Sequence, residues 1–284
     1  MSKNYRAELV GVFGDPVDDN PTGVMEESAF EYCGLNYRYL TLRVTPDDLG
    51  DAVRAIRAFH MKGINLTMPH KINVIPKLDG ISEAAQIIGA VNTVVVKEDN
   101  SLYGENTDGK GFVQALNNRG ISLAGKKLLI LGAGGAARAV SVECALAGAE
   151  KITILNRTED KATELAGVIN NNTPAKAEGY HWTPGYRIPE ETDILVNATS
   201  IGFSPDINGK PDIDYDSIHA GMTVVDVVFY PCETLFLKEA AKRGAETVNG
   251  LGMLACQGAL NFTLWTGVPA PLEVMEEQLR KEFI

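Results

Sequence analysis

Short apolar runs alternate with longer amphipathic stretches along nearly the whole chain. Apolar runs at about residues 9–13, 64–67, 127–131, 152–155, 193–197 and 223–227 are typical of buried strands, and residues 37–44 alternate like a half-buried strand. Helical patterns occupy about residues 23–33, 45–61, 109–119, 252–265 and 271–283, and a further helix ends near residue 147. This alternation of strands and helices predicts an α/β fold built on parallel sheets.

Two segments depart from that alternation. Residues 91–96 and 102–104 flank the polar sequence 98–101, Glu-Asp-Asn-Ser, which predicts a β-hairpin. Residues 171–192 are rich in Asn, Thr, Pro and Gly, and no element is predicted there. No internal repeat is visible, and a length of 284 residues corresponds to about two domains.

The composition is that of a globular protein and narrows the choice of partners. Hydrophobic residues make up 45% of the chain and charged residues 22%, which suffices for packed cores. The net charge of −11 repels phosphate backbones, so we expect no nucleic-acid partner. An anionic substrate would need a local positive site. No apolar run reaches the roughly 18 residues of a membrane span, so no membrane partner is expected.

The cysteines and the N-terminus point to a cytoplasmic protein without a metal site. None of the four cysteines, Cys33, Cys144, Cys232 and Cys256, belongs to a CxxC pair, and their spacing matches no zinc site. Buried reduced thiols are the expectation for all four. The first residues lack the apolar core of a signal peptide. The oligomeric state stays open between monomer and homodimer.

A glycine-rich turn follows the apolar run that ends at residue 131. The strand leads into Gly132-x-Gly134-x-x-Ala137 and then a helix, which is the context that dinucleotide binding requires. Gly132 permits the tight turn, Gly134 admits the pyrophosphate to the backbone, and Ala137 lets the helix pack closely on the strand. The helix N-terminus supplies N–H groups for the phosphates. A turn that binds nothing is the weaker alternative, because a second strand follows after about twenty residues.

The end of that second strand indicates which dinucleotide binds. NAD enzymes usually place an acidic residue there, whereas this chain has Asn156-Arg157-Thr158. Arg157 can pair with a 2′-phosphate through charge-assisted hydrogen bonds, and Lys161 can assist one turn later. The alternative is that Arg157 is a solvated surface cation. Glu159 and Asp160 would oppose a phosphate if they faced it. We therefore expect NADP in preference to NAD.

Polar clusters follow strands in the first part of the chain as well. They comprise residues 65–71, 89–93 and 104–109, and ligands of parallel α/β sheets bind beyond the carboxyl ends of the strands. Taken singly, each residue has an ordinary alternative. Lys71 can be a surface residue, and Asp108 can simply cap the helix at 109–119. The case for a site therefore depends on the clusters occurring together.

Eight motifs, in order, give the chain its resemblance to the shikimate dehydrogenase family along nearly its whole length. They are Asn65-Leu66-Thr67-Met68-Pro69-His70-Lys71, Ile88-Gly89-Ala90-Val91-Asn92-Thr93, Gly104-Glu105-Asn106-Thr107-Asp108-Gly109, Gly132 to Ala136, Asn156-Arg157-Thr158, Asn197-Ala198-Thr199-Ser200, Asp226-Val227-Val228-Phe229-Tyr230 and Gly252-Met253-Leu254-Ala255-Cys256-Gln257.

The resemblance implies a two-domain α/β protein. An N-terminal α/β substrate domain would comprise residues 1–108 and 252–284, and a doubly wound, Rossmann-type domain for NADP would comprise residues 109–251. The implied reaction is the reversible, NADP-dependent reduction of 3-dehydroshikimate to shikimate, a step of chorismate and aromatic amino acid biosynthesis. The implied partner is a small carboxylated cyclic polyol.

The same matching implies roles for individual residues. Lys71 and Asp108 would form the catalytic pair, since a cationic lysine stabilises a developing alkoxide and a carboxylate orients it. Either member can be the formal acid. The residues implied for the substrate are Asn20, Thr22, Asn65, Thr67, Asn92, Tyr230 and Gln257. Those implied for the cofactor are Gly132, Ala133, Gly134, Gly135, Ala136, Asn156, Arg157, Thr158, Lys161, Asn197, Thr199, Ser200, Gly252 and Met253. For Tyr230 a packed strand-end aromatic is an equal alternative, and Met253 taken alone would be a core residue.

The main departure from the family lies near the N-terminus. The family's His-Ser-x-Ser-Pro segment, whose serines hold a substrate carboxylate, aligns with residues 19–23, so Asn20 and Thr22 replace the serines. Both can still donate a hydrogen bond. Asp18 and Asp19 would weaken carboxylate binding if they faced the site. A quinate/shikimate dehydrogenase therefore remains an alternative, as does a catalytically silent NADP-binding sensor, against which Lys71 and Asp108 argue.

Overall fold

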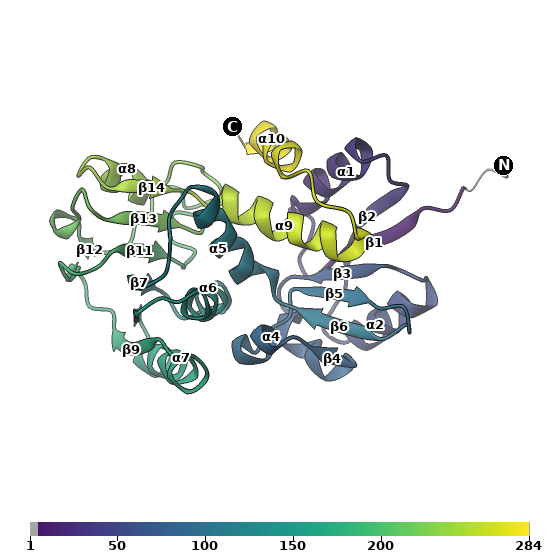
Figure 1. Cartoon of the computed structure of the whole chain (residues 1–284), viewed down its shortest axis with the longest axis horizontal. Helices are drawn as coiled ribbons and strands as arrows, with labels where there is room; N and C mark the ends of the chain where they lie inside the picture. The colour runs from purple at the N-terminus through teal and green to yellow at the C-terminus, as the bar shows by residue number, and fades with distance from the viewer. Residues whose placement is uncertain (1–4, 284) are drawn as a thin grey trace. The chain divides into compact units, whose positions relative to one another are not determined.

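The computed structural model describes residues 5–283, which fall into two compact units (Figure 1). Of the described residues, unit 1 comprises 5–107 and 255–282, and unit 2 comprises 108–254 with Phe283. None of the helices within residues 5–283 combines the length and the apolar character that crossing a membrane requires.

Unit 1 is built around a six-stranded sheet with the strand order β2-β1-β3-β5-β6-β4. Its strands are β1 (Glu8–Gly14), β2 (Tyr37–Arg43), β3 (Gly63–Leu66), β4 (Gly80–Ile81), β5 (Thr93–Val96) and β6 (Leu102–Glu105). Its helices include α1 (Thr22–Tyr32), α2 (Leu49–Ala58), α3 (His70–Asn73), α4 (Glu83–Ile88), most of α9 (Leu251–Thr266) and nearly all of α10 (Leu272–Phe283). The β5–β6 pair is antiparallel, which confirms the predicted hairpin.

Local sequence signals explain several boundaries in unit 1. The Ser82 hydroxyl caps α4 by accepting the Ala85 N–H, and Gly89 ends that helix in the left-handed conformation at φ 73°. The indole N–H of Trp265 on α9 donates to the Val94 carbonyl on β5 at 3.1 Å. A side chain at Gly63 would collide with that indole, so only glycine fits there. These contacts hold the C-terminal helices against the N-terminal sheet.

Unit 2 contains a six-stranded sheet, all parallel, with the order β14-β13-β11-β7-β8-β9. The strands are β7 (Lys127–Leu131), β8 (Lys151–Asn156), β9 (Lys176–His181), β11 (Ile194–Asn197), β13 (Thr223–Asp226) and β14 (Glu246–Val248). The helices are α5 (Thr107–Asn118), α6 (Gly135–Leu146), α7 (Glu159–Asn172) and α8 (Leu235–Ala241). Chain order reverses between β7 and β11, which is the topological switch point of a doubly wound sheet. The predicted α/β, Rossmann-type architecture is thereby confirmed.

Two expectations about secondary structure need correction. The second helix begins at Leu49 rather than at residue 45, because residues 45–48 form a turn in which the Asp48 N–H donates to the Thr45 carbonyl. It ends at Ala58, before the left-handed His60 at φ 53°. Residues 171–192, left without a predicted element, contribute the edge strand β9 and the short strand β10 (Tyr186–Arg187).

Each unit has its own apolar core. The central strands β3 and β11 are buried at all four of their positions, as expected of strands covered on both faces. In unit 1 the stacked rings of Phe30 and Phe262 join α1 to α9 with their centroids 5.4 Å apart. In unit 2 Phe236 of α8 is fully buried in a cluster with residues of β11 and β13.

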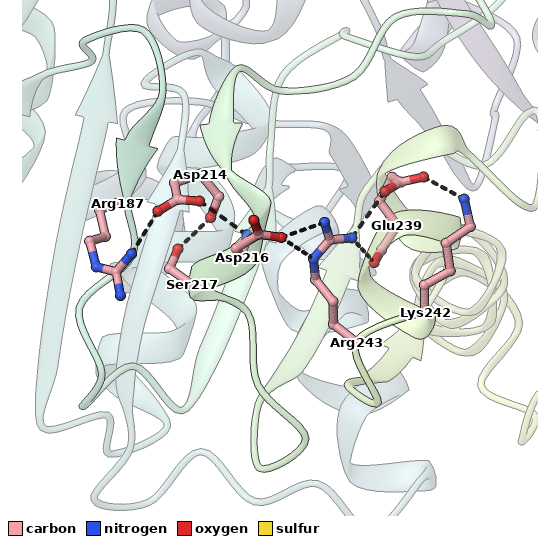
Figure 2. A network of polar contacts seen from close by, with 7 residues as sticks. All are labelled: Arg187, Asp214, Asp216, Ser217, Glu239, Lys242 and Arg243. Atoms are coloured by element: carbon pink, nitrogen blue, oxygen red, sulfur yellow. Dashed lines mark hydrogen bonds and ion pairs between the residues drawn. The ribbon is translucent and has the colours of Figure 1, made fainter.

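An ion-pair network lies at the surface of unit 2 (Figure 2). Arg187 of β10 pairs with Asp214 of β12 (Ile213–Asp214) at 2.8 Å. Arg243 bridges Asp216 at 2.8 Å and Glu239 of α8 at 3.0 Å. The network links the small β10–β12 sheet to α8. Arg187 and Asp216 are exposed, and the other three side chains are half-buried, so each pair contributes little stability by itself.

Candidate functional site

Strand directions in unit 1 gather the predicted substrate residues at one edge of its sheet. Strand β5 runs antiparallel to β3 with Thr93 opposite Asn65, and β6 runs antiparallel to β5 with Glu105 opposite Thr93. The end of β3, the start of β5 and the end of β6 therefore share one edge. Strand β1 is parallel to β3, so the loop after Gly14 begins at the same edge. The polar clusters of the sequence thus meet in space.

A buried hydrogen-bond network crosses this edge. The Tyr39 hydroxyl donates to Asn65 Oδ1 at 2.9 Å, and it also makes a hydrogen bond with the Thr22 side chain. Asn65 Nδ2 donates to the Asn92 carbonyl at 3.1 Å and to Thr93 Oγ1 at 3.0 Å. Both amide protons of Asn65 are therefore used inside the protein, and one Oδ1 lone pair remains for a ligand.

The network continues onto α9. Asn261 Oδ1 accepts from Thr93 Oγ1 at 2.7 Å and from Thr107 Oγ1 at 2.8 Å. Asn261 Nδ2 donates to Gln257 Oε1 at 3.1 Å, one turn earlier on the helix. This bond fixes the Gln257 amide so that its N–H₂ group points away from Asn261. Thr93, Thr107 and Asn261 were not among the predicted site residues.

The loop before α1 carries the two residues that replace the family's serines. Asn20 Oδ1 accepts the Thr22 backbone N–H at 3.1 Å and thereby fixes the start of the helix. This leaves the Asn20 N–H₂ group as a donor. Thr22 is buried, with 6% of its surface exposed. Asp18 and Asp19 are exposed to solvent, so water screens their effect on a bound anion.

Lys71 lies on the short helix α3, whose backbone is fixed from several sides. The neighbouring His70 is fully buried, and its Nε2 lies 2.7 Å from the Val44 carbonyl. The His70 N–H donates to the Thr67 carbonyl, and the Lys71 carbonyl accepts the Val91 N–H at 2.8 Å. Lys71 itself is half-buried, as is Thr67, four residues earlier. His70 therefore holds α3 in place.

Asp108 begins unit 2, whereas Lys71 belongs to unit 1. Asp108 lies in the first turn of α5, where a carboxylate interacts favourably with the helix dipole. Asn92 Oδ1 accepts the Thr107 backbone N–H at 2.7 Å at the start of the same helix. The pairing of Lys71 with Asp108 remains part of the proposal below.

In unit 2 the predicted cofactor residues follow the carboxyl ends of parallel strands. Gly132 follows β7 with a φ of 108°, a conformation that favours glycine, and a side chain there would press on Thr199. Gly134 precedes α6 without a side-chain cap. Gly134 and Gly135 are exposed, and no atom lies within 4 Å of a side chain built at either position. The N-terminus of α6 is thus open to a phosphate group.

The end of β8 carries two exposed cations, Arg157 and Lys161, with the exposed carboxylates Glu159 and Asp160 between them in sequence. Asn156 Nδ2 donates to the Thr158 carbonyl at 2.9 Å, which shapes the turn into α7. Arg157, Thr158 and Lys161 are exposed. Thr158 precedes α7 without a side-chain cap. Arg157 and Lys161 are therefore accessible to a ligand at the carboxyl end of β8.

Asn197 at the end of β11 is fully buried and supports its neighbours. Its Nδ2 donates to Asp226 Oδ1 at 3.0 Å and to the Ile201 carbonyl at 3.1 Å. Its Oδ1 accepts from the Thr199 hydroxyl at 2.6 Å. Asn197 therefore shapes the turn that carries Thr199 and the exposed Ser200.

Asp226, at the end of β13, is a buried carboxyl that this turn depends on. It accepts hydrogen bonds from the Thr234 hydroxyl at 2.7 Å, the Val228 N–H at 3.0 Å and Asn197. Burial raises its pKa from 3.8 to about 6, and these hydrogen bonds oppose the rise. Ionisation of Asp226 is thus less favourable in the folded protein than in the unfolded chain, despite three hydrogen-bond partners.

We expect Asp226→Asn to flatten the pH dependence of stability. Because the folded pKa is raised, the favourable contribution of Asp226 is fully present below about pH 3.8 and is lost as the pH rises through about 6. The difference between these pKa values corresponds to about 3 kcal/mol. Urea unfolding of both proteins at pH 4 to 7 gives the free energy of unfolding, and its decrease with rising pH should be absent from the variant. An equal decrease with pH in the two proteins would contradict the pKa assigned to Asp226.

Three further predicted residues lie in unit 2. Tyr230 is 42% exposed, and its ring lies 5.6 Å from that of Phe283 between centroids. Phe229 packs on the same ring at 5.3 Å. The packed-aromatic alternative for Tyr230 therefore has direct support. Gly252 and Met253 begin α9 just after β14 and are half-buried.

Three family models match successive parts of the chain. They are the shikimate dehydrogenase substrate binding domain over residues 12–94, shikimate / quinate 5-dehydrogenase over residues 114–202, and the shikimate 5′-dehydrogenase C-terminal domain over residues 250–280. The first falls within unit 1, and the second falls within unit 2.

Individual relatives cover nearly the whole chain. A shikimate dehydrogenase (NADP(+)) of Desulforamulus reducens is 43% identical, over 98% of this chain and 97% of its own. The ligand-free crystal structure of 5-ketofructose reductase from Gluconobacter sp. strain CHM43 is 44% identical with a TM-score of 0.95, covering 99% and 100% of the two chains. A shikimate dehydrogenase crystallised with NADP+ is 37% identical with a TM-score of 0.91, covering 99% and 97%.

Proposed function

Because the chain belongs to the shikimate dehydrogenase family, we propose that it is an NADP-dependent oxidoreductase that interconverts a ketone and an alcohol on a small polyhydroxylated substrate. Shikimate and 3-dehydroshikimate are the first candidate pair, as for the curated relatives. The observation that carries the proposal is the combination of an open phosphate-binding turn in unit 2 with a polar sheet edge bearing Lys71 in unit 1.

The cofactor would be held along the carboxyl edge of the unit 2 sheet. The backbone of residues 132–136 would bind the pyrophosphate, and Arg157, with Asn156, Thr158 and Lys161, would bind the 2′-phosphate. Thr199, Ser200, Gly252 and Met253 would lie along the remainder of the cofactor. When bound, the reduced cofactor supplies the hydride that reduces the ketone.

Lys71 and Asp108 would complete the reduction. The Lys71 ammonium lies beside the substrate carbonyl oxygen in this proposal, so it stabilises the negative charge that develops there and supplies a proton. Asp108 would orient the ammonium. The rigid backbone of α3 supports this role, because a donor that is already in place needs little reorganisation.

Neutral polar groups would recognise the substrate ring. Asn65, Thr67, Asn92 and Gln257 lie on elements of unit 1 that share one edge, and the network through Asn261 orients three of them. A site that is built to hydrogen-bond hydroxyl groups rejects analogues that lack them, because buried polar atoms are then left unpaired. Asn20, Thr22 and Tyr230 would contact the end of the substrate that carries the carboxylate in shikimate.

A second candidate substrate is 5-ketofructose, which is a neutral sugar without a carboxylate. The observation that favours it is the pair Asn20 and Thr22 in place of the two serines that hold a carboxylate in the family. A relative named 5-ketofructose reductase matches the whole fold with a TM-score of 0.95. Both candidates use the same hydride transfer and the same catalytic pair.

A dehydrogenase assay tests the proposal. The purified chain is given shikimate or quinate with NADP and with NAD, and 5-ketofructose with the reduced cofactors, and the nicotinamide absorbance is followed. Turnover of at least one substrate with a preference for the phosphorylated cofactor supports the proposal. Absence of turnover with every pair would favour a ligand-binding sensor and overturn the proposed activity.

Restoring the family's serines separates the two candidates. The double variant Asn20→Ser/Thr22→Ser should tighten shikimate binding, since each new hydrogen bond to a carboxylate contributes at most about 1.5–3 kcal/mol. It should weaken binding of 5-ketofructose if that is the native substrate. Michaelis constants for both compounds measure the effect. Unchanged constants for both would mean that this loop does not contact the ligand.

A further inference from the structure

Asn261 is a fully buried amide on α9 and lies at the centre of the polar network of unit 1. Its Oδ1 accepts from Thr93 Oγ1 at 2.7 Å and from Thr107 Oγ1 at 2.8 Å, and its Nδ2 donates to Gln257 Oε1 at 3.1 Å. A hydroxyl carries a single proton, so each threonine can donate to Asn261 only if its other partner donates to it. The groups behind the two threonines therefore decide which end of the Asn261 amide faces them.

A backbone N–H fixes the direction of the hydrogen bonds at Thr107. This N–H, which belongs to Thr107 itself and can only donate, lies 2.7 Å from Asn92 Oδ1. The oxygen of the Asn92 amide therefore lies on that side, and its Nδ2 donates to Thr107 Oγ1 at 2.9 Å. The hydroxyl proton of Thr107 then goes to Asn261 Oδ1, because the alternative acceptor, Asn92 Oδ1, is more distant at 3.2 Å.

A backbone carbonyl fixes the direction of the hydrogen bonds at Thr93 in the same way. The Asn92 carbonyl, which can only accept, lies 3.1 Å from Asn65 Nδ2. The same Nδ2 group donates to Thr93 Oγ1 at 3.0 Å. The hydroxyl proton of Thr93 then goes to Asn261 Oδ1, which at 2.7 Å is closer than Asn92 Oδ1 at 3.1 Å. Both threonines thus require an oxygen at the same position of the Asn261 side chain.

We propose that Asn261 is a positioning residue that acts through Gln257 and makes this side chain a hydrogen-bond donor to the substrate. Because the Asn261 oxygen serves both threonines, its Nδ2 faces Gln257, whose Oε1 must accept. The Gln257 N–H₂ group is thereby turned away from Asn261, where it can donate to a substrate oxygen. The inference rests on the proposed function, in which Gln257 contacts the substrate, and adds that the substrate atom at this contact is a hydrogen-bond acceptor.

Neutron diffraction from crystals of the deuterium-exchanged protein tests these directions without any measurement of activity. We expect the hydroxyl deuterons of Thr93 and Thr107 to point at Asn261 Oδ1. Both deuterons on Gln257 Nε2 should point away from Asn261. A Gln257 deuteron directed at Asn261 overturns the inference.

Asn261→Asp tests the consequence for substrate binding. The carboxylate keeps the shape of the amide and can accept from both threonines, but it has no N–H group, so Gln257 must turn and present Oε1 to the substrate. Hydrogen bonds from two hydroxyls and the turned amide favour the ionised carboxylate. For whichever candidate substrate the wild type turns over, we expect KM to rise about tenfold and kcat to change by less than about threefold, as for a contact that acts on binding.

A double-mutant cycle with Gln257→Ala separates positioning from a merely structural role. In the Gln257→Ala background, Asn261→Asp should change KM by less than about twofold, because its effect passes through the missing side chain. Leu264→Asp is the control, since it adds the same charge at a position of α9 that is 43% exposed, and it should leave KM and kcat unchanged. An equal rise in KM with and without Gln257, or no rise in Asn261→Asp alone, overturns the role of Asn261.

The outcomes distinguish this inference from the proposed function. A wild type that turns over none of the candidate substrates overturns the proposed function, and the neutron structure then decides the positioning of Gln257 by itself. The neutron structure also decides if Asn261→Asp fails to fold. An active wild type with a Gln257 deuteron directed at Asn261 overturns the role of Asn261 alone.

Discussion

Replacing Lys71 by alanine should lower kcat by about two to four orders of magnitude, which is the range for losing one positioned acid or electrostatic group. The affinity for NADP should barely change, because Lys71 belongs to unit 1 and the proposed dinucleotide residues belong almost entirely to unit 2. Steady-state kinetics gives the loss of turnover, and fluorescence titration with NADPH gives the affinity. Loss of NADP binding with retained turnover would show that the assignment is wrong.

Lys77→Ala is the matched control for this experiment. Lys77 is an exposed lysine six residues later, so its removal changes the net charge of the same segment equally. Its kcat should remain within about twofold of the wild type, as for most surface substitutions. A comparable loss in both variants would indicate that general electrostatics, rather than a positioned ammonium, supports catalysis.

Asp108→Asn tests whether the two groups act as a unit. If Asp108 works by orienting the Lys71 ammonium, removing it after Lys71 is already absent should cost little. The double variant should then be about as slow as Lys71→Ala, because residues that act together have non-additive effects. Additive losses would mean that Asp108 has a separate role.

The strands and the cofactor turn could be predicted from the sequence because their signals are local. The apolar run at residues 127–131 leads directly into Gly132, and the need for glycine there follows from a turn with φ at 108°. The meeting of Asn65 with Thr93 at one sheet edge depends instead on the antiparallel pairing of β3 with β5. The predicted hairpin at residues 91–104 indicated the β5–β6 part of that arrangement.

The polar network behind the substrate edge could not be predicted, because its partners are remote in sequence. Thr93 and Asn261 are 168 positions apart and meet through a 2.7 Å hydrogen bond. The available signal was Asn261 itself, an amide within an otherwise apolar helix and one turn after Gln257.

The second helix shows why a local rule failed. Thr45-Pro46 has the pattern of a helix start, but the Thr45 hydroxyl donates to the Asp48 carboxylate at 2.7 Å and stabilises a separate turn. The edge strand β9 was missed because only one of its six residues is buried, which leaves no apolar alternation. Pairing with β8 over six residues determines this strand.

Removal of the Arg157 guanidinium should weaken NADP binding about 10- to 100-fold and leave NAD binding unchanged. Arg157 is exposed at the end of β8, where a charge-assisted hydrogen bond to a 2′-phosphate contributes about 1.5–3 kcal/mol. Because the site is open to solvent, the loss should shrink in high salt. Dissociation constants of Arg157→Ala for both dinucleotides, at low and high ionic strength, measure the effect.

Arg187→Ala is the control for the arginine substitution, since Arg187 is an exposed arginine of the same unit that pairs with Asp214 (Figure 2). It should leave both affinities unchanged. Lys161→Ala should produce a smaller loss for NADP alone, because an ammonium acts as a point charge without the planar fork of a guanidinium. Equal weakening of NADP and NAD in Arg157→Ala would place the arginine elsewhere on the cofactor. If neither affinity changes in Arg157→Ala, the carboxylates Glu159 and Asp160 rather than the arginine face that surface. The preference for NADP would then need another origin.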